Sequence, residues 1–325
     1  MQFLVAAGQK SAVQIHEMKF LSAKALDGLF NRKAFHRHLA DFLKADLHMP
    51  QRTHHDFAGN TLLMMPAWND RFLGVKTATV APGNGALGKP VVHAVYTLFD
   101  AQTGEPLLQM DGQRLTALRT ATASALAAKQ LARPDARHLL VVGAGALCPE
   151  LIRAHAFELP IEEVSIWNRN PDRARQVARC FSEVSLRVNV AENLAAAAAQ
   201  ADVISCATPS AEPLLHGSWI RPGTHIDLVG SYRPDLREAD DELIRKADVW
   251  LDNPAAVVES GDIAVPLKNG VLTEARIKGT LREILSGTCE LRQSAEQITV
   301  FKSVGYALED LAAATWFFAK KKEKA

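Results

Sequence analysis

The chain has 325 residues, and its 37 lysine and arginine residues against 36 aspartate and glutamate residues give a formal net charge of +1. This length exceeds what one hydrophobic core usually supports, so we expect two domains, and the balanced charge argues against nucleic acid or an anionic membrane as a partner. The four scattered cysteines fit reduced thiols rather than disulfides or a metal site, and the sequence shows neither a membrane span nor a signal peptide, so we expect a cytoplasmic protein.

The first 50 residues predict a strand at residues 1–6 and amphipathic helices at 13–30 and 35–47. Residues 51–125 are rich in β-prone runs, with strands expected at 62–68, 72–78, 91–100 and 107–110. The loop at 78–90 is long enough to border a binding site. An alanine-rich helix at 121–131 then leads into the second half of the chain.

Residues 138–169 have the pattern of a dinucleotide-binding βαβ unit: a β-prone run, a glycine turn, an amphipathic helix and a second β-prone run. Gly143 allows the tight turn, and Gly145 lets the backbone approach a pyrophosphate at the positive end of the helix. Cys148 replaces the third glycine, where a small residue can still pack. We expect the pyrophosphate to contact Gly143, Ala144, Gly145, Ala146 and Leu147.

The end of the second strand indicates which nicotinamide cofactor binds. An acidic residue there would bind the ribose 2′-hydroxyl of NAD, but this chain has Asn168 and Arg169, followed by Arg173. A guanidinium can pair with a 2′-phosphate, so NADP(H) is expected to be preferred and NAD(H) is possible. The alternative is that Arg169 only stacks on the adenine.

The alternation of strands and helices continues to residue 302. Loops after the carboxyl ends of parallel strands hold the ligand in such sheets, and this places Thr208, Pro209 and Gly230 beside the nicotinamide half of the cofactor. Ser303 follows the last strand and is a further candidate for cofactor binding. The apolar face of the final helix, at 306–320, suggests that it packs back against the first domain.

With these pieces in order, the chain resembles the ornithine cyclodeaminase/μ-crystallin family, and most closely its Δ1-pyrroline-2-carboxylate (cyclic ketimine) reductase branch. The motifs that carry the resemblance are residues 115–121, which lead into the glycine turn, residues 230–235 with Glu238, and residues 300–305. The resemblance implies an α/β protein in which a Rossmann-type NAD(P)-binding domain (126–302) is inserted into an α+β substrate-binding and dimerisation domain (1–125 plus 303–325). It also implies a homodimer.

The resemblance assigns the substrate carboxylate to Arg52, Lys76 and Arg119. The chemistry agrees, because a small imino or keto acid needs fixed cations and an arginine fork suits a carboxylate. Taken singly, each residue has a structural interpretation: a surface cation, a strand-end lysine and an internal ion pair. Lys76 and Arg119 are also candidates for the catalytic step.

Two departures separate the chain from the cyclodeaminases. Tyr232 falls where their catalytic aspartate lies, and a tyrosine, with an ordinary pKa of about 10, is a poor base near neutral pH. Val91 replaces a substrate-binding threonine, and His93, two residues further along the strand, could donate to the substrate or could simply pack in the strand. Solution, Lys76, His93 or Ser231 are all open as the source of the imine proton.

The sequence therefore predicts NAD(P)H-dependent reduction of a cyclic ketimine carboxylate, with Δ1-pyrroline-2-carboxylate, which gives L-proline, ahead of Δ1-piperideine-2-carboxylate, which gives L-pipecolate. Alanine dehydrogenase and ornithine cyclodeaminase activities are the enzymatic alternatives. A μ-crystallin-like protein that binds NADPH and a small ligand, with little turnover, is the alternative of another class.

Overall fold

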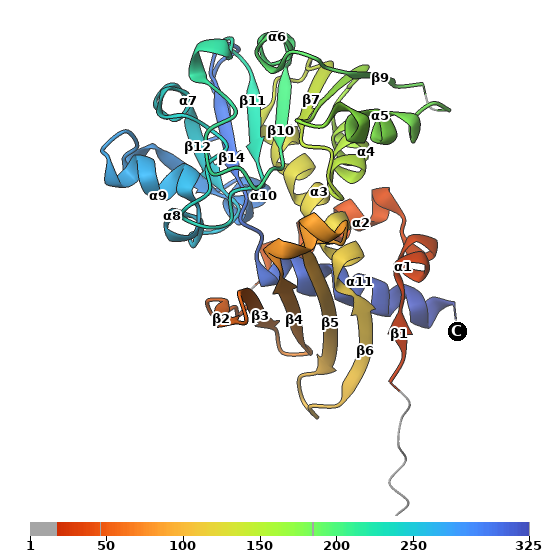
Figure 1. Ribbon diagram of the computed structural model, residues 1–325. Helices are drawn as coiled ribbons and strands as arrows, with labels where there is room; N and C mark the ends of the chain where they lie inside the picture. Colours follow the sequence, from red (N-terminus) through yellow and green to blue (C-terminus); the bar gives the residue numbers. More distant parts are fainter. Residues whose placement is uncertain (1–17, 46, 184, 325) are drawn as a thin grey trace, which may run out of the picture.

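The computed structural model describes residues 18–45, 47–183 and 185–324. Two sheets organise these residues, and Figure 1 shows them one above the other with helix α3 (Gly112–Leu131) running between them. The predicted fold class, an α/β protein, agrees with this arrangement of two sheets and their helices. The strand expected at residues 1–6 lies outside the described residues.

The smaller sheet has six strands in the order β1-β6-β5-β4-β3-β2. Only β1 and β6 pair in parallel; the other neighbours are antiparallel. The strands span Phe20–Leu21 (β1), Thr53–Phe57 (β2), Asn60–Trp68 (β3), Phe72–Val80 (β4), Val92–Asp100 (β5) and Pro106–Asp111 (β6). A short 3-10 helix, Pro82–Leu87, fills the predicted loop between β4 and β5.

One face of this sheet is covered by α1 (Ala23–Leu29), α2 (Arg32–Lys44) and the last helix, α11 (Ala307–Glu323). Their apolar side chains form a core with the inward residues of the strands, including Phe35, Tyr96 and Phe317. The final helix therefore packs on the first half of the chain, as its apolar face suggested.

The larger sheet has eight parallel strands in the order β13-β12-β14-β11-β10-β7-β8-β9. They are His138–Val142 (β7), Glu163–Trp167 (β8), Arg187–Val190 (β9), Val203–Cys206 (β10), His225–Leu228 (β11), Asp248–Leu251 (β12), Ile277–Thr280 (β13) and Thr299–Lys302 (β14). The chain runs outward from β7 through β8 and β9, and β10 and β11 lie on the other side of β7. This reversal of strand order is the point where such sheets bind their ligand.

Helices cover both faces of the larger sheet (Figure 1). They are α4 (Cys148–Glu158), α5 (Pro171–Arg179), α6 (Leu194–Gln200), α7 (Asp241–Lys246), α8 (Ala256–Glu259), α9 (Gly261–Lys268) and α10 (Leu281–Ser286). Two 3-10 turns, Gly217–Trp219 and Glu274–Arg276, complete the described elements. Within the described ranges, no helix combines the length and the apolar character that crossing a bilayer requires.

Two predicted helices differ from the structure, and one strand of the smaller sheet was not predicted. Of the helix expected at 13–30, residues 13–17 lie outside the described residues. Within residues 18–30, Phe20 and Leu21 pair with β6 as a strand, and α1 begins at Ala23 after the cap residue Ser22. Strand β2 was not expected, because its sequence is polar and it forms a fully exposed edge. Helix α3 begins nine residues before the expected start, so the domain boundary placed at 125/126 falls inside it; the domain limits stay a prediction.

Candidate active site

The turn after β7 has the geometry that a pyrophosphate site requires. Gly143 has a φ of +106°, and a Cβ atom there would lie 2.8 Å from the carbonyl oxygen of Ala207. At Gly145 a Cβ would meet no described atom within 4 Å, so its backbone is open to a ligand. Cys148 is 1% exposed and begins α4, which confirms that a small residue packs at the third glycine position. These residues fit a dinucleotide whose pyrophosphate lies at the positive end of α4.

A cavity of about 410 Å³ lies at the end of β8, where the adenosine ribose is expected. Arg169 lines it, and so does Arg175, which the sequence analysis missed. Arg173 is exposed and does not line this cavity. Asn168 has a structural role as well, because its side-chain oxygen accepts a 3.1 Å hydrogen bond from the N–H of Ala144 in the glycine turn.

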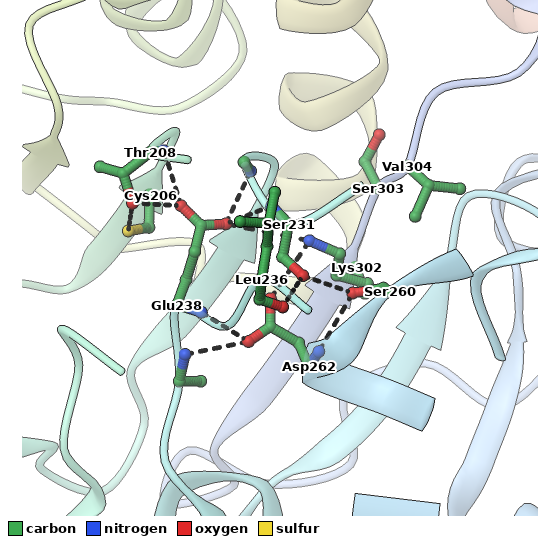
Figure 2. Close-up of polar contacts among 12 residues, drawn as sticks. Cys206, Thr208, Ser231, Leu236, Glu238, Ser260, Asp262, Lys302, Ser303 and Val304 are labelled. Atoms are coloured by element: carbon green, nitrogen blue, oxygen red, sulfur yellow. Dashed lines mark hydrogen bonds and ion pairs between the residues drawn. The ribbon is translucent and has the colours of Figure 1, made fainter. Parts of the chain in front are cut away.

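The loops that follow β10 and β11 contact each other closely. A Cβ at Gly230 would lie 2.0 Å from the carbonyl oxygen of Thr208, so only glycine fits there. Pro209, beside Thr208, is exposed. Figure 2 shows Thr208 and the Ser231 loop side by side, joined through the carboxylate of Glu238. The structure thus brings Thr208 and Gly230 together at the carboxyl ends of two central strands.

A cavity of about 310 Å³ collects the three predicted carboxylate-binding residues. Arg52, Lys76 and Arg119 all line it, although they come from the loop before β2, from β4 and from α3. Ala146 and Leu147 of the glycine turn line the same cavity. The structure therefore places three cations and the turn that suits a nicotinamide cofactor around one space.

Arg119 is 3% exposed and is held by two acidic residues at the start of α11. Its Nε donates to Asp310 at 2.8 Å, and its Nη1 donates to Glu309. Burial alone would lower the pKa of Arg119, but these two carboxyl groups more than offset it and raise the pKa. The guanidinium is therefore a fixed, permanent cation.

Lys76 shares Asp310 with Arg119, at 2.8 Å from Nζ to the second carboxylate oxygen. Burial lowers the pKa of Lys76 to about 8, although the attraction of Asp310 opposes this change. Burial also raises the pKa of Glu309, against the attraction of Arg119. Asp310 therefore holds both Lys76 and Arg119 at the wall of the cavity, where an anionic ligand would meet cations that are fixed in place.

Arg52 is oriented by a turn that a buried carboxylate organises. Its Nη2 donates to the carbonyl oxygens of Val304 and Gly305 and lies 2.9 Å from Glu259. Asp252, at the end of β12, accepts hydrogen bonds from the N–H groups of Val304 at 2.8 Å and Gly305 at 2.6 Å. The orientation of Arg52 therefore depends on Asp252 and Glu259.

Three predicted residues do not point into the cavity. His93 is exposed, whereas its neighbours Val92 and Ala94 line the cavity, because successive strand residues face opposite sides of the sheet. Ser231 is fully buried, and its hydroxyl donates to the carbonyl oxygen of Leu236. The hydroxyl of Ser303 donates to Asp252 at 3.1 Å. We therefore withdraw His93 and Ser231 as proton donors and Ser303 as a cofactor-binding side chain.

Tyr232 does line the cavity, in the place where the resemblance puts the cyclodeaminase aspartate. Burial raises the pKa of the Tyr232 phenol, so it stays protonated at neutral pH. A neutral phenol cannot act as the base that removal of an amino group needs.

Sequence reasoning missed the acidic partners of the three cations: Glu309, Asp310, Glu259 and Asp252. Asp310 lies 191 positions after Arg119 in the chain, and no local motif links them. Thr116, which lies 3.5 Å from Nζ of Lys76, could have been found, because it is one helical turn before Arg119 and so shares its face.

The sequence model of the ornithine cyclodeaminase/mu-crystallin family matches residues 10–325. Protein SAR DEFICIENT 4 of Arabidopsis thaliana is 40% identical over 264 residues, which cover 78% of this chain and 81% of that protein. The Delta(1)-pyrroline-2-carboxylate reductase of Paracoccus denitrificans is 38% identical over 259 residues, which cover 79% of this chain and 82% of that protein.

Solved structures agree. Thermococcus litoralis Delta(1)-pyrroline-2-carboxylate reductase, in complex with NADH and L-proline, superposes with a TM-score of 0.90 at 34% identity, over 94% of this chain and 98% of that one. An archaeal alanine dehydrogenase dimer with bound NAD gives a TM-score of 0.89 at 27% identity, over 94% and 97% of the two chains. The motifs, the fold and these matches together show that the chain belongs to the ornithine cyclodeaminase/mu-crystallin family.

Proposed function

We propose that this protein reduces the C=N bond of a cyclic ketimine carboxylate with NADPH, and that its substrate is Δ1-pyrroline-2-carboxylate, which becomes L-proline. The observation that carries the proposal is the convergence of Arg52, Lys76 and Arg119 on the cavity that Ala146 and Leu147 of the glycine turn also line. The enzyme class itself is confirmed by the family and by its reductase members: the chain is an NAD(P)H-dependent oxidoreductase that acts on C=N bonds.

In the proposed complex, the substrate carboxylate is bound by the three cations. Arg119 is rigid, because two acidic residues hold Nε and Nη1, and Arg52 is held by the carbonyls of the 304–305 turn. Fixed cations orient the carboxylate, and therefore the adjacent C2 atom, without further loss of side-chain entropy on binding. The bound reduced nicotinamide supplies the hydride that C2 accepts.

We assign the proton for the imine nitrogen to Lys76. Its pKa of about 8 means that it is mostly protonated at neutral pH but can release its proton readily, which suits a general acid. Asp310 lies 2.8 Å from Nζ and would steady the ammonium group. With His93 and Ser231 facing elsewhere, Lys76 is the candidate that remains besides solution.

The decisive experiment compares substrates in one preparation. NADPH oxidation is followed with Δ1-pyrroline-2-carboxylate, with Δ1-piperideine-2-carboxylate, and with pyruvate plus ammonia. We expect the highest kcat/KM with the five-membered ketimine. Higher kcat/KM with pyruvate and ammonia would favour alanine dehydrogenase, and release of ammonia from ornithine with NAD would favour a cyclodeaminase. Tight NADPH binding without oxidation by any of these compounds would favour a binding protein.

The preference for NADPH over NADH is part of the proposal. It is supported by Arg169 and Arg175 at the cavity after β8, where a 2′-phosphate would lie. The Thermococcus relative was solved with NADH, so the two cofactors must be compared directly in this protein.

A homodimer is likewise proposed. The outer face of the smaller sheet carries Met64 and Val95, each 40% exposed, on either side of Thr77 in one row across three strands. Phe57 and Trp68 add exposed apolar area to this face. An apolar sheet face of this kind marks an association surface, and the archaeal relative is a dimer. Light scattering gives the molar mass of the purified protein in solution and so tests for the dimer. We expect Met64→Lys to shift the equilibrium from dimer to monomer.

A further inference from the structure

One buried carboxylate joins the two loops that are expected to border the nicotinamide. Glu238 accepts hydrogen bonds from the backbone N–H of Thr208 at 2.7 Å, of Gly230 at 2.6 Å and of Ser231 at 3.3 Å. The Thr208 hydroxyl adds a fourth bond at 3.1 Å. The loops after β10 and β11 are therefore fixed to each other through one residue (Figure 2).

This anchoring decides where the neighbouring carbonyls point. In a trans peptide the N–H and the C=O of one unit point in opposite directions. When the N–H groups of Thr208 and Gly230 face Glu238, the carbonyls of Ala207 and Val229 face away from it. The carbonyl oxygen of Ala207 lies 2.8 Å from where a Cβ of Gly143 would be, so it faces the cofactor turn. Glu238 thereby fixes the direction of the Ala207 carbonyl, whose oxygen faces the proposed cofactor site.

The charge around Glu238 is unbalanced. Nζ of Lys302 lies 3.3 Å from Asp262 and 3.8 Å from Glu238, and all three side chains are fully buried. Asp262 also accepts hydrogen bonds from the N–H groups of Glu238 at 2.7 Å and Ala239 at 3.0 Å. Two carboxyl groups thus share one ammonium group, and the cluster carries one net negative charge when both are ionised.

We propose that Glu238 is a positioning residue whose buried charge favours the cationic, oxidised nicotinamide over the neutral, reduced ring. This rests on the proposed function, because it places the nicotinamide beside the loops of Thr208 and Gly230. Transfer of a hydride moves a hydrogen and its bonding electron pair to C2 of the substrate, while the imine nitrogen takes a proton and the ring is left with a positive charge. A fixed negative charge in a water-excluded region lowers the free energy of that cation.

Equilibrium binding tests the proposal without turnover. The Kd values of NADP⁺ and NADPH are measured by fluorescence for the parent, for Glu238→Gln and for the control Glu242→Gln. Glu242 is a partly exposed glutamate on α7 that pairs with Lys246, so its variant makes the same change of charge elsewhere. We expect Glu238→Gln to weaken NADP⁺ about tenfold relative to NADPH, and the control to leave the ratio unchanged.

Equal weakening of both cofactors in Glu238→Gln would show a structural role only and would overturn the proposal, as would an unchanged ratio. If Glu238→Gln does not fold, Asp262→Asn removes one negative charge from the same cluster and should shift the ratio in the same direction. A parent protein that binds neither cofactor would remove the proposed function together with this inference. If the parent binds both cofactors and Glu238→Gln leaves the ratio of their Kd values unchanged, only this inference is overturned and the proposed function stands.

The parent protein offers a second readout. Burial raises the pKa of Glu238 to about 7, against the attraction of Lys302. The titratable groups that face it are Lys302 from β14, Asp262 from α9 and the thiol of Cys206 from β10, whose pKa burial raises well above its usual value. As pH falls from 8 to 6, the Kd of NADP⁺ should rise relative to the Kd of NADPH in the parent. In Glu238→Gln this ratio of Kd values should not change with pH. NAD⁺ and NADH, which have no 2′-phosphate to titrate, should show the same trend.

Discussion

Two buried clusters combine lysine or arginine with acidic residues, but they differ in whether a ligand can reach them. The first contains Arg119, Lys76 and Asp310 and lines a cavity of about 310 Å³. The second contains Glu238, Asp262 and Lys302, and each of these side chains is fully buried. In the first, both cations line the cavity, whereas in the second two carboxyl groups share one buried ammonium group.

The difference shows how similar residues acquire different tasks. In the first cluster, ion pairs between side chains of α3, β4 and α11 hold the two cations at the wall of a cavity. That cavity leaves room for an anion. In the second, backbone N–H groups occupy the carboxylate oxygens, so these carboxylates hold loops together and would act on a ligand only from a distance. Two substitutions in the first cluster test its side of this contrast, and two at other predicted site residues sharpen it, beginning with the largest expected effect.

Arg119→Ala should lower kcat/KM for the ketimine roughly 100-fold or more, because it removes the rigid cation and leaves Asp310 buried without it. The free energy of unfolding should fall by about 3–5 kcal/mol for the same reason. Affinity for NADPH should be unchanged. Steady-state kinetics, denaturant unfolding and fluorescence titration measure these quantities. Arg114→Ala is the matched control, because Arg114 lies on the same helix but pairs with Asp27 and Glu150 outside the cavity. Full activity in Arg119→Ala would exclude it from the site.

Lys76→Gln should lower kcat/KM by about 100-fold, which is the usual contribution of a general acid. In the parent, kcat/KM should fall as pH rises through about 8, because Lys76 then loses the proton that it donates. The variant should lack that fall, whereas a fall caused by deprotonation of the imine itself would persist in both proteins. A pH profile of each protein separates these outcomes, and identical profiles would refute the role of Lys76.

Arg169→Ala should raise the KM for NADPH about tenfold and change the KM for NADH little, since only NADPH has a 2′-phosphate for the guanidinium to bind. Arg173→Ala, at an exposed position that does not line the cavity after β8, serves as the control and should change neither value. An equal effect of Arg169→Ala on both cofactors would indicate stacking on the adenine instead.

His93→Ala should change kcat/KM by less than about twofold, because exposed side chains away from a site contribute little. His93→Ala is the control for Lys76→Gln, because His93 lies on the neighbouring strand β5 but does not line the cavity. A tenfold loss of kcat/KM would indicate that His93 donates a proton to the substrate, and it would contradict the orientation of β5 described above.

Most of the residues expected to bind the cofactor could be predicted from the sequence, because the patterns that identify them are local. Gly143 and Gly145 lie between a strand and a helix, and Asn168 and Arg169 end the next strand, so short-range patterns locate them. The carboxylate-binding residues came from resemblance, since a lone arginine or lysine carries no such pattern. Their acidic partners escaped prediction, because Asp310 reaches Arg119 only when α11 packs against α3.

His93 shows a different limit. The β-prone run at 91–100 predicted β5, but which side of a strand faces the cavity depends on its packing in the sheet, and adjacent residues alternate. The structure directs Val92 and Ala94 to the cavity and His93 to the opposite face. The hydroxyls of Ser231 and Ser303 also face away from the cavity, because each donates to an acceptor, the carbonyl of Leu236 or the carboxylate of Asp252, that only the folded chain brings near.

Isotope transfer tests the central claim most directly. The protein is incubated with Δ1-pyrroline-2-carboxylate and NADPH carrying deuterium at the transferable C4 position, and the product is analysed by chiral chromatography and mass spectrometry. We predict L-proline with one deuterium at C2. Oxidation of the cofactor without deuterium in proline, or no reaction while the cofactor binds, would contradict the account.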